Sequence, residues 1–355
     1  MRILKYNYRL EGFPNFEDWV TDDIYFQKLN LVVGKNATGK SRVVTAITAF
    51  AEMITQEKNI YWGNFDFTFI REDEKLLSYI INKDKNGVIT EKLFIDKKLV
   101  LDRSRETTKL YSFLKKDFDT ITPPDYKLVL HIRRDKEEYP YLEDIVSWAE
   151  RMHFFKFGQI HTTSFLGEEG TGERLITVED IPALIKELDE SSKNEIIEEF
   201  NMLEYNLEVL YTKQESGKDI LYTKEKGLKY ALRQSRLSQG MFRALALIVF
   251  IHDLYAKGIA DTIIVDDLGE GLDYERATKL GELIFKKLEN TNIQFIASSN
   301  DSFLMDVVDI KYWNILVRSD NAVKVHNYDN NKEKFDNFKF SGLSNFDLFS
   351  SDYLE

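Results

Sequence analysis

The chain contains no cysteine among its 355 residues, which excludes disulfide bonds and thiolate metal sites. Long apolar runs are missing as well. One of the longest, residues 244–251, is far shorter than the roughly 20 residues of a membrane-spanning helix. Residues 1–6 carry charges where a secretory signal peptide needs an uninterrupted apolar stretch. These absences predict a cytoplasmic protein with no membrane partner.

An excess of positive charge is also absent. The formal net charge is −12 and the pI is about 5.1, which argues against strong autonomous binding of nucleic acid but leaves a local contact open. Hydrophobic residues make up 43% and charged residues 30%, the balance of a globular chain with one large or two medium domains. No heptad pattern is sustained, so a long coiled coil is not expected.

The chain does contain the octet Gly-Lys-Asn-Ala-Thr-Gly-Lys-Ser at residues 34–41, between an apolar run and a segment that can continue as a helix. A strand, a glycine loop and a helix in this order form the context of a phosphate-binding loop. The glycines let backbone N–H groups converge on a phosphate chain, and the positive end of the helix adds to the attraction. In that motif the lysine reaches the β- and γ-phosphates and the serine ligates Mg²⁺. The residues expected to bind the nucleotide are therefore Gly34, Lys35, Asn36, Ala37, Thr38, Gly39, Lys40, Ser41 and Arg42.

A β-rich segment is expected after this helix. Phe65, Phe67 and Phe69 alternate with polar residues, and a turn signal at 84–87 separates further alternating stretches. This pattern predicts an antiparallel meander. After two consecutive prolines, the apolar residues at 127–132 predict another short strand.

A second helix start with anion-binding features lies at residues 237–243. Ser238 is a natural N-cap, and Gly240 permits close approach of another backbone. Further along, the apolar run 262–265 ends in Asp266 and Asp267, as expected for a buried strand whose last carboxylate meets Mg²⁺. Asp266 is the expected metal-side acid, and Asp267 lies where a general base for the attacking water is expected. The next apolar strand is followed by Asn300, where a polar group can sense the γ-phosphate.

The phosphate loop, the helix start at 237–243, the acidic strand end and Asn300 follow one another in this order along the chain. These motifs resemble those of the ABC-type ATPase heads, and more narrowly those of the soluble heads related to SMC, RecF and the double-strand-break-repair ATPases. The sequence is most similar to the compact "AAA family" ATPases of bacterial anti-phage defence loci, such as the Septu and retron-associated ATPases. The resemblance implies an α/β P-loop fold with a mixed sheet, an antiparallel β subdomain and an inserted helical lobe. It implies one ABC-type head over residues 1–355, with the meander and the lobe inserted at 56–235.

The resemblance also implies roles for individual residues. The family usually has Glu where Asp267 stands, so Glu270 is a second candidate for the general base, and the family's switch histidine is replaced by Asn300. Both changes point to slow hydrolysis. Gln159 is the candidate for the glutamine that links the metal to the inserted lobe, and Gln294 is the weaker alternative. The expected catalytic residues are thus Asp267, Glu270 and Asn300, with Ser41 and Asp266 as metal ligands.

In the resembled family, the helix start that corresponds to residues 237–243 caps a nucleotide held by another subunit. The resemblance therefore implies a homodimer or a higher homo-oligomer, with Lys40, Ser41 and Asp266 from one copy and Ser238 and Gly240 from the other around ATP and Mg²⁺. Two functions stay open: a hydrolysing switch or motor, and a nucleotide-locked scaffold for a partner. A transporter subunit is a weaker third reading, because of the β-rich insertion and the missing switch histidine. No nuclease cluster is visible in the chain, so a nuclease effector would be a separate partner.

Overall fold

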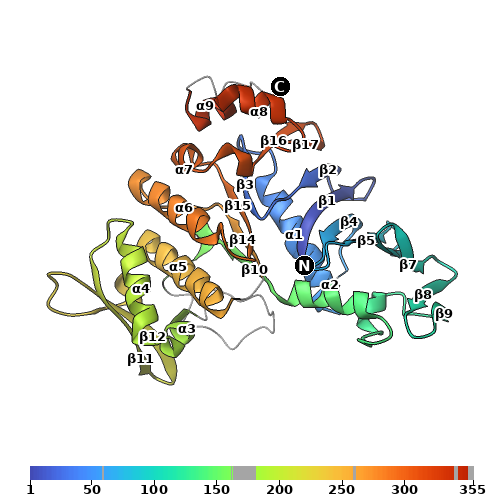
Figure 1. The fold of residues 1–355 in the computed structure, drawn as a ribbon, viewed down its shortest axis with the longest axis horizontal. Helices are drawn as coiled ribbons and strands as arrows, with labels where there is room; N and C mark the ends of the chain where they lie inside the picture. Colours follow the sequence, from blue (N-terminus) through green and yellow to red (C-terminus); the bar gives the residue numbers. More distant parts are fainter. Residues whose placement is uncertain (58–59, 161, 163–180, 259–260, 340–342, 351–355) are drawn as a thin grey trace. The chain divides into compact units, whose positions relative to one another are not determined.

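The computed structural model describes residues 1–57, 60–160, 162, 181–258, 261–339 and 343–350 (Figure 1). The chain forms two compact units: unit 1 comprises residues 1–152 and 311–337, and unit 2 comprises residues 153–310 and 338–355. Within the described ranges, no helix combines the length and the apolar character needed to cross a bilayer. The expected insertion at 56–235 thus contributes to both units, and its boundaries as a domain stay a prediction.

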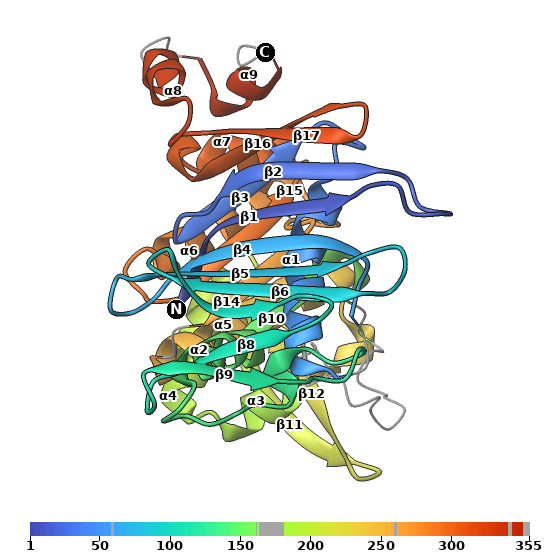
Figure 2. The ribbon, with the colours of Figure 1, turned by 90° about the vertical axis from the view of Figure 1, so that its right-hand side faces the viewer.

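Unit 1 contains a mixed sheet with the strand order β3-β16-β17-β2-β1-β4-β5-β6-β7-β8-β9 (Figure 2). β16 pairs with β3 and β17 with β2 in parallel, whereas the strands from β4 to β9 form an antiparallel meander, as the alternating sequence predicted. The strands are β1 (Arg2–Leu10), β2 (Trp19–Tyr25), β3 (Leu29–Gly34), β4 (Gly63–Ile70), β5 (Leu76–Lys83), β6 (Ile89–Ile95), β7 (Lys98–Arg103), β8 (Thr108–Ser112), β9 (Asp117–Ile121), β16 (Trp313–Ser319) and β17 (Ala322–Asn327).

The core of unit 1 is aromatic. β4 buries every second residue, so Phe65, Phe67 and Phe69 share one face of the sheet. Phe50 of helix α1 (Lys40–Thr55) stacks on Phe67 with ring centroids 4.0 Å apart, and Trp148 of helix α2 (Pro140–Glu150) packs edge-on against Phe69 at 4.7 Å. Each fully buried phenylalanine contributes about 1.5–3 kcal/mol. These contacts fix the helix that follows the phosphate loop against the sheet.

The predicted strand at 127–132 is wrong. Residues Val129–His131 form a 3₁₀ turn, η1. The His131 ring holds it: Nδ1 accepts the Leu128 N–H at 3.2 Å, so Nε2 carries the proton and donates to Met53 O of α1 at 2.9 Å. Burial lowers the pKa of His131. The apolar side chains of this segment reach the core from a turn anchored by a side chain, so strand pairing is not needed.

A buried polar cluster joins the meander to η1. The Glu91 carboxylate on β6 accepts hydrogen bonds from the Tyr79 hydroxyl, from Arg103 Nη1 at 2.8 Å and from the Val129 N–H at 3.1 Å. Burial raises the pKa of Glu91, an effect that these hydrogen bonds oppose. Arg103 also donates to the carbonyls of Pro124 and Lys127. Its guanidinium therefore ties β7 to the segment that leaves the sheet after β9.

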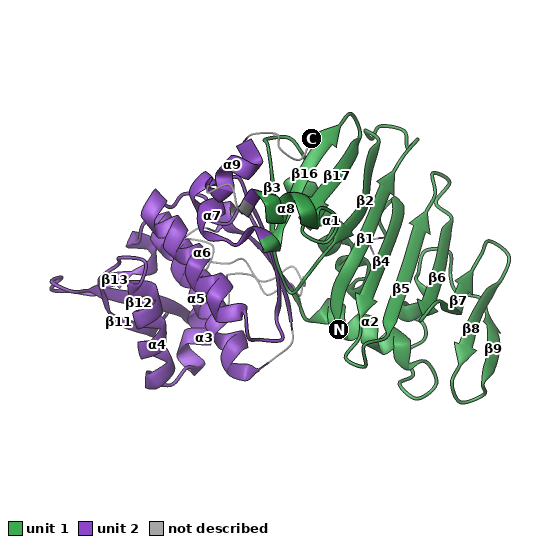
Figure 3. Cartoon of the chain, turned by 45° about the horizontal axis from the view of Figure 1, so that its top comes forward, with its two compact units in different colours: residues 1–152, 311–337 green, residues 153–310, 338–355 purple. Residues whose placement is uncertain are grey.

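Unit 2 contains strands in the order β10-β14-β15, with β14 and β15 parallel. It also contains a small antiparallel sheet, β11-β12-β13 (Figure 3). Helix α5 is buried from Met241 to Leu254, which explains its continuous apolar sequence. The expected α/β class with a mixed sheet and an antiparallel β subdomain is confirmed.

The remaining elements of the described residues are β10 (Met152–Lys156), η2 (Phe157–Gln159), α3 (Ile181–Glu187), α4 (Glu190–Asn201), β11 (Leu207–Glu215), β12 (Lys218–Glu225), β13 (Leu232–Arg233), η5 (Gln234–Arg236), α5 (Gln239–Lys257), β14 (Thr262–Asp266), α6 (Tyr274–Leu288), β15 (Gln294–Ser299), α7 (Ser302–Val307), η6 (Ile310–Tyr312), α8 (Lys332–Lys339) and α9 (Asn345–Ser350).

Candidate nucleotide-binding site

The phosphate loop of unit 1 is a closed ring around a lysine ammonium. Lys40 is 8% exposed, and its Nζ donates to Gly34 O at 2.8 Å and to Lys35 O at 3.4 Å. The Thr38 hydroxyl and N–H both donate to Lys35 O, at 2.8 and 3.2 Å. Ala37 and Gly39 adopt left-handed backbone conformations, with φ of 66° and 100°. The loop therefore already has the tight curvature that directs successive amides to one point.

The start of α1 offers a donor set that fits a phosphate chain. Lys40, Ser41 and Arg42 form the first turn, whose backbone N–H groups have no partner inside the helix. The N-cap is Gly39, which has no side chain to satisfy them, and the first turn holds no acidic residue. Ser41 is exposed and presents a hydroxyl oxygen, a hard ligand suited to Mg²⁺. Residues 34–42 thus fit a nucleotide phosphate with its magnesium ion.

A buried tryptophan packs against this loop. Trp19 of β2 is 2% exposed, and a Cβ added to Gly39 would lie 2.3 Å from its indole ring, so only glycine fits there. The guanidinium groups of Arg42 and Arg318 lie 4.4 and 5.0 Å from the indole centroid, and Arg318 Nη1 also donates to Ala37 O at 3.2 Å. Neither Trp19 nor Arg318 belongs to a recognisable motif. Arg318 reaches the loop because its strand, β16, pairs with β3, the strand that leads into the loop.

In unit 2, the acidic pair follows the buried strand as predicted. Asp266 ends β14 and is 6% exposed. Ser298 of the neighbouring β15 donates from its hydroxyl to Asp266 Oδ1 at 2.5 Å and accepts the Asp267 N–H at 2.9 Å. Asp267 adopts a left-handed conformation with φ of 57°, which an L-residue seldom adopts. One serine hydroxyl therefore bonds both the Asp266 carboxylate and the Asp267 backbone, and no sequence motif pointed to Ser298.

The turn after Asp267 lies against the segment that contains Gln159. A Cβ on Gly158 would fall 1.7 Å from Glu270 Oε2, so the Glu270 carboxylate rests directly on the Gly158 backbone. Arg243 holds the two segments together: Nη1 donates to Glu270 O and Nε to Ile160 O, both at 3.0 Å, and Nη2 donates to Gly158 O. Gln159 ends the turn η2. The backbone on both sides of Gln159 is thus fixed to the turn after the acids.

The predicted helix start at Ser238 has the expected local geometry. Ser238 is the N-cap of α5, and its hydroxyl accepts the Met241 N–H at 3.2 Å. A Cβ on Gly240 would lie 2.7 Å from Gly271 O, so the glycine lets α5 approach the turn after the acids.

The two remaining predicted residues of unit 2 lie in or after β15. Asn300 is exposed and follows β15, and Asp301 caps α7. Gln294, the alternative to Gln159, is 1% exposed within β15. Each unit therefore carries its own group of predicted site residues.

Residues 29–306 match the family described as "AAA domain, putative AbiEii toxin, Type IV TA system". The chain belongs to this AAA-domain family. No curated protein matches this family member.

Solved structures show the fold of this family member. An Smc head bound to the C-terminal winged-helix domain of ScpA is similar with a TM-score of 0.56 and 16% identity, covering 92% of this chain and 97% of that one. The SMC head domain of Thermotoga maritima gives 0.50 and 14%, covering 92% and 99%. The Smc head of Pyrococcus furiosus, solved with an extended coiled coil and bound to the C-terminal domain of ScpA, gives 0.55 and 14%, covering 95% and 99%. The AAA-domain protein therefore has the fold of an SMC-type P-loop ATPase head, as the resemblance predicted.

Proposed function

We propose that the protein is a slowly hydrolysing ABC-type ATPase, and that two copies close around ATP and Mg²⁺. The observation that carries this proposal is the phosphate loop, where Lys40 lies inside a ring of backbone and α1 has Gly39 as its N-cap, with no side-chain cap and no acidic residue in its first turn. In the proposed cell context, the protein is a cytoplasmic switch or motor subunit of a defence or DNA-related complex. The family description, which names a putative toxin of a toxin–antitoxin system, supports the defence context.

In this proposal, different residues bind the phosphates and the Mg²⁺ ion. Lys40 and the amides of residues 34–42 hold the phosphates, and Ser41 and Asp266 supply oxygen ligands for Mg²⁺, which would neutralise charge on the β- and γ-phosphates. Ser238 and Gly240 come from the second copy, where the start of α5 offers N–H groups to the γ-phosphate. Gln159 links the metal to the inserted lobe.

The proposed slow turnover rests on three features of unit 2. Asp267 is one methylene shorter than glutamate, and its backbone is left-handed, with φ of 57°. Misplacing a base by about 1 Å can cost about a hundredfold in rate. The Glu270 carboxylate lies against the Gly158 backbone, and in this proposal it leaves that position to act as the base. Asn300 can donate a hydrogen bond but carries no charge.

A nucleotide-locked scaffold is the second candidate, because the same three features weaken hydrolysis and leave binding intact. A transporter subunit is the least supported alternative. A separate effector, such as a nuclease, remains part of the proposal, and nucleic acid is not favoured by the net charge of −12. The genes beside this one test the context: a nuclease gene favours defence, and a permease gene favours transport.

The experiment measures ATP affinity and phosphate release together. Lys40→Ala should lose at least about tenfold in ATP affinity, equivalent to about 1.4 kcal/mol. Lys109→Ala, an exposed lysine on β8, is the matched control and should bind like the wild type. Phosphate release that disappears in Lys40→Ala identifies the ATPase, and tight binding without release identifies the scaffold. Unchanged ATP binding by Lys40→Ala would refute the assignment of the loop.

Assembly is tested by light scattering after size exclusion, with and without ATP and Mg²⁺. Asp267→Asn should accumulate the closed dimer in ATP, because the proposed base is removed while the binding groups remain. The wild type should dimerise transiently. A monomer under all these conditions, in both proteins and at all concentrations, would count decisively against the paired site.

A further inference from the structure

The sheet of unit 1 ends in an exposed edge strand, β9. Its inner edge pairs with β8, with Tyr111 opposite Phe118 and Lys109 opposite Thr120. The Phe118 N–H donates to the Asp117 carboxylate at 2.8 Å, so it is turned away from β8. Since hydrogen-bonding directions alternate along an antiparallel strand, Thr120 also presents its N–H and C=O outward. Along the described part of the chain, no backbone group pairs with this outer edge.

Apolar side chains flank this edge. Phe118 is 41% exposed, and the turn between β8 and β9 exposes Phe113 by 45% and Leu114 by 64%. Tyr111 lies between the two phenylalanines, with ring centroids 5.5 Å from Phe113 and 5.3 Å from Phe118. An edge strand beside exposed aromatic rings combines outward backbone groups, of which the Phe118 N–H is held by its neighbour Asp117, with apolar contact area. This combination is suited to an added strand.

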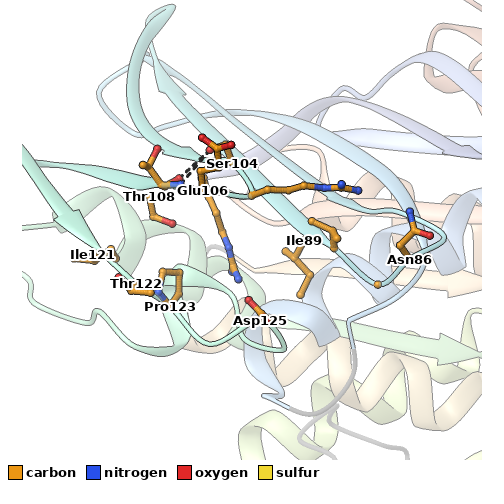
Figure 4. A pocket seen from close by; sticks show the side chains of 14 residues that line it. Asn86, Ile89, Ser104, Glu106, Thr108, Ile121, Thr122, Pro123 and Asp125 are labelled. Carbon is orange, nitrogen blue, oxygen red and sulfur yellow. Dashed lines mark hydrogen bonds between the residues drawn. The ribbon is translucent and has the colours of Figure 1, made fainter.

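A cavity lies at the far end of β9. Its volume is about 400 Å³, and its walls come from the end of β9, from the segment 122–125 and from the turns at 86–89 and 103–108 (Figure 4). Figure 4 shows the Asp125 side chain in this cavity, across from Asn86 and Ile89. A strand added to β9 would pass its aromatic rings first and reach this cavity at its end.

The unpaired charge of the cavity is negative. Of the two arginines that line it, Arg103 is paired with the buried Glu91 and Arg105 is paired with Asp84 at 2.9 Å. The remaining charged lining residues, Glu106 and Asp125, are exposed, and they form no ion pair with any described residue. The cavity therefore favours an ammonium or a guanidinium group.

We propose that β9 and this cavity bind an extended peptide segment of a partner protein. The peptide adds a strand along Phe118 and Thr120, places an apolar residue against the exposed aromatic rings, and inserts a lysine or arginine beside Asp125. A second copy of β9 fits this edge poorly. The antiparallel register that pairs all five residues of two β9 strands places Asp119 opposite the Asp119 of the other copy, which is repulsive.

The test uses a random library of displayed 12-residue peptides, selected on the full-length protein. Enriched peptides are then synthesised, and their affinities are measured by fluorescence anisotropy. Thr120→Pro removes the outward N–H at an edge position where proline is tolerated, and Thr120→Val is its control because it keeps the N–H. Asp125→Lys reverses the cavity charge, and Glu11→Lys is a control at an exposed acid elsewhere in unit 1. Phe118→Asp provides a third arm if the proline variant does not fold.

Enriched peptides should alternate apolar and polar residues and carry Lys or Arg near one end. Thr120→Pro, or Phe118→Asp in its place, and Asp125→Lys should each weaken binding by about tenfold or more, and both controls should stay within about twofold of the wild type. Failure to enrich any sequence overturns the proposal. So does equal binding by wild type and Asp125→Lys, or by wild type and the β9 variant. Dimers of the protein that disappear in the β9 variant would identify a second copy as the occupant and overturn the choice of a partner peptide.

Discussion

Replacing Ser298 by alanine tests whether one buried hydroxyl organises the acidic pair. The Ser298 Oγ donates to Asp266 Oδ1 at 2.5 Å and accepts the Asp267 N–H at 2.9 Å, and Ser298 itself is 0% exposed. Alanine removes both hydrogen bonds while it leaves the volume of the strand nearly unchanged. Asp266, which is 6% exposed, then loses the donor that faces its carboxylate.

The expected loss of stability follows from the two hydrogen bonds. A hydrogen bond to a charged group contributes about 1.5–3 kcal/mol, and an unsatisfied buried N–H costs about 1–3 kcal/mol. We therefore expect Ser298→Ala to lower the free energy of unfolding by about 3 kcal/mol. At about 2–4 °C per kcal/mol for a domain of 150–250 residues, the melting temperature should fall by about 6–12 °C.

Ser299→Ala is the matched control. Ser299 is equally buried, at 1% exposed, but its hydroxyl donates to the uncharged Leu268 O at 3.0 Å and accepts the Asp301 N–H at 3.1 Å. Its loss should cost about 1–2 kcal/mol, because neutral hydrogen bonds contribute about 1 kcal/mol each. Calorimetric melting of both variants gives the comparison.

A second measurement separates orientation from stability. If Asp266 binds Mg²⁺, losing the hydroxyl that orients it should weaken Mg²⁺ binding. The Mg²⁺ concentration that gives half-maximal ATP binding should then rise by about 10- to 100-fold. This is measured by titrating Mg²⁺ at fixed ATP. Equal melting temperatures for Ser298→Ala and Ser299→Ala, together with equal magnesium titrations, would refute the reasoning.

Two further predictions concern unit 1. Because burial lowers the pKa of His131 below its usual value of 6.5, its contribution to stability is present above that pH and is lost as the pH falls through the lowered pKa. Melting temperatures from about pH 7.5 to about pH 5 should fall less for His131→Gln than for the wild type, and parallel curves would contradict this. Gly39→Ala should lose ATP affinity by about tenfold or more, because the new Cβ would meet Trp19 at 2.3 Å. Gly12→Ala, at a φ of 70° with no atom within 4 Å, is its control, and the idea fails if both variants bind ATP alike.

Local sequence was sufficient to predict the elements whose chemistry is local. Residues 34–41 place two glycines and a Lys-Ser ending at the spacing of a phosphate loop, so spacing alone indicates this loop. The same holds for Ser238, since an N-cap needs only its own side chain and the next turn. Asp266 could be placed because a buried strand ends where its apolar run ends.

The supporting residues could not be predicted, because their roles arise from chain crossings. Trp19 reaches Gly39 only because β2 lies in the same sheet, and Arg318 reaches Ala37 because β16 pairs with the strand before the loop. Ser298 is an ordinary strand residue until β15 aligns with β14. The wrong strand at 127–132 has the same origin, since the hydrogen bond from His131 to α1 stabilises a turn that the local apolar pattern does not reveal.

The Arg243 guanidinium connects three separate segments of unit 2 by hydrogen bonds. A guanidinium has five donors in a rigid plane, and here it donates to carbonyls of Gly158, Ile160 and Glu270 while it is only 7% exposed. Shifting one of these segments alone would leave buried charged donors unsatisfied, at a cost of about 1–3 kcal/mol or more. The start of α5, the turn η2 and the turn after the acids must therefore move together. If Ser238 meets the nucleotide of another copy, the same displacement reaches Glu270 and the backbone beside Gln159.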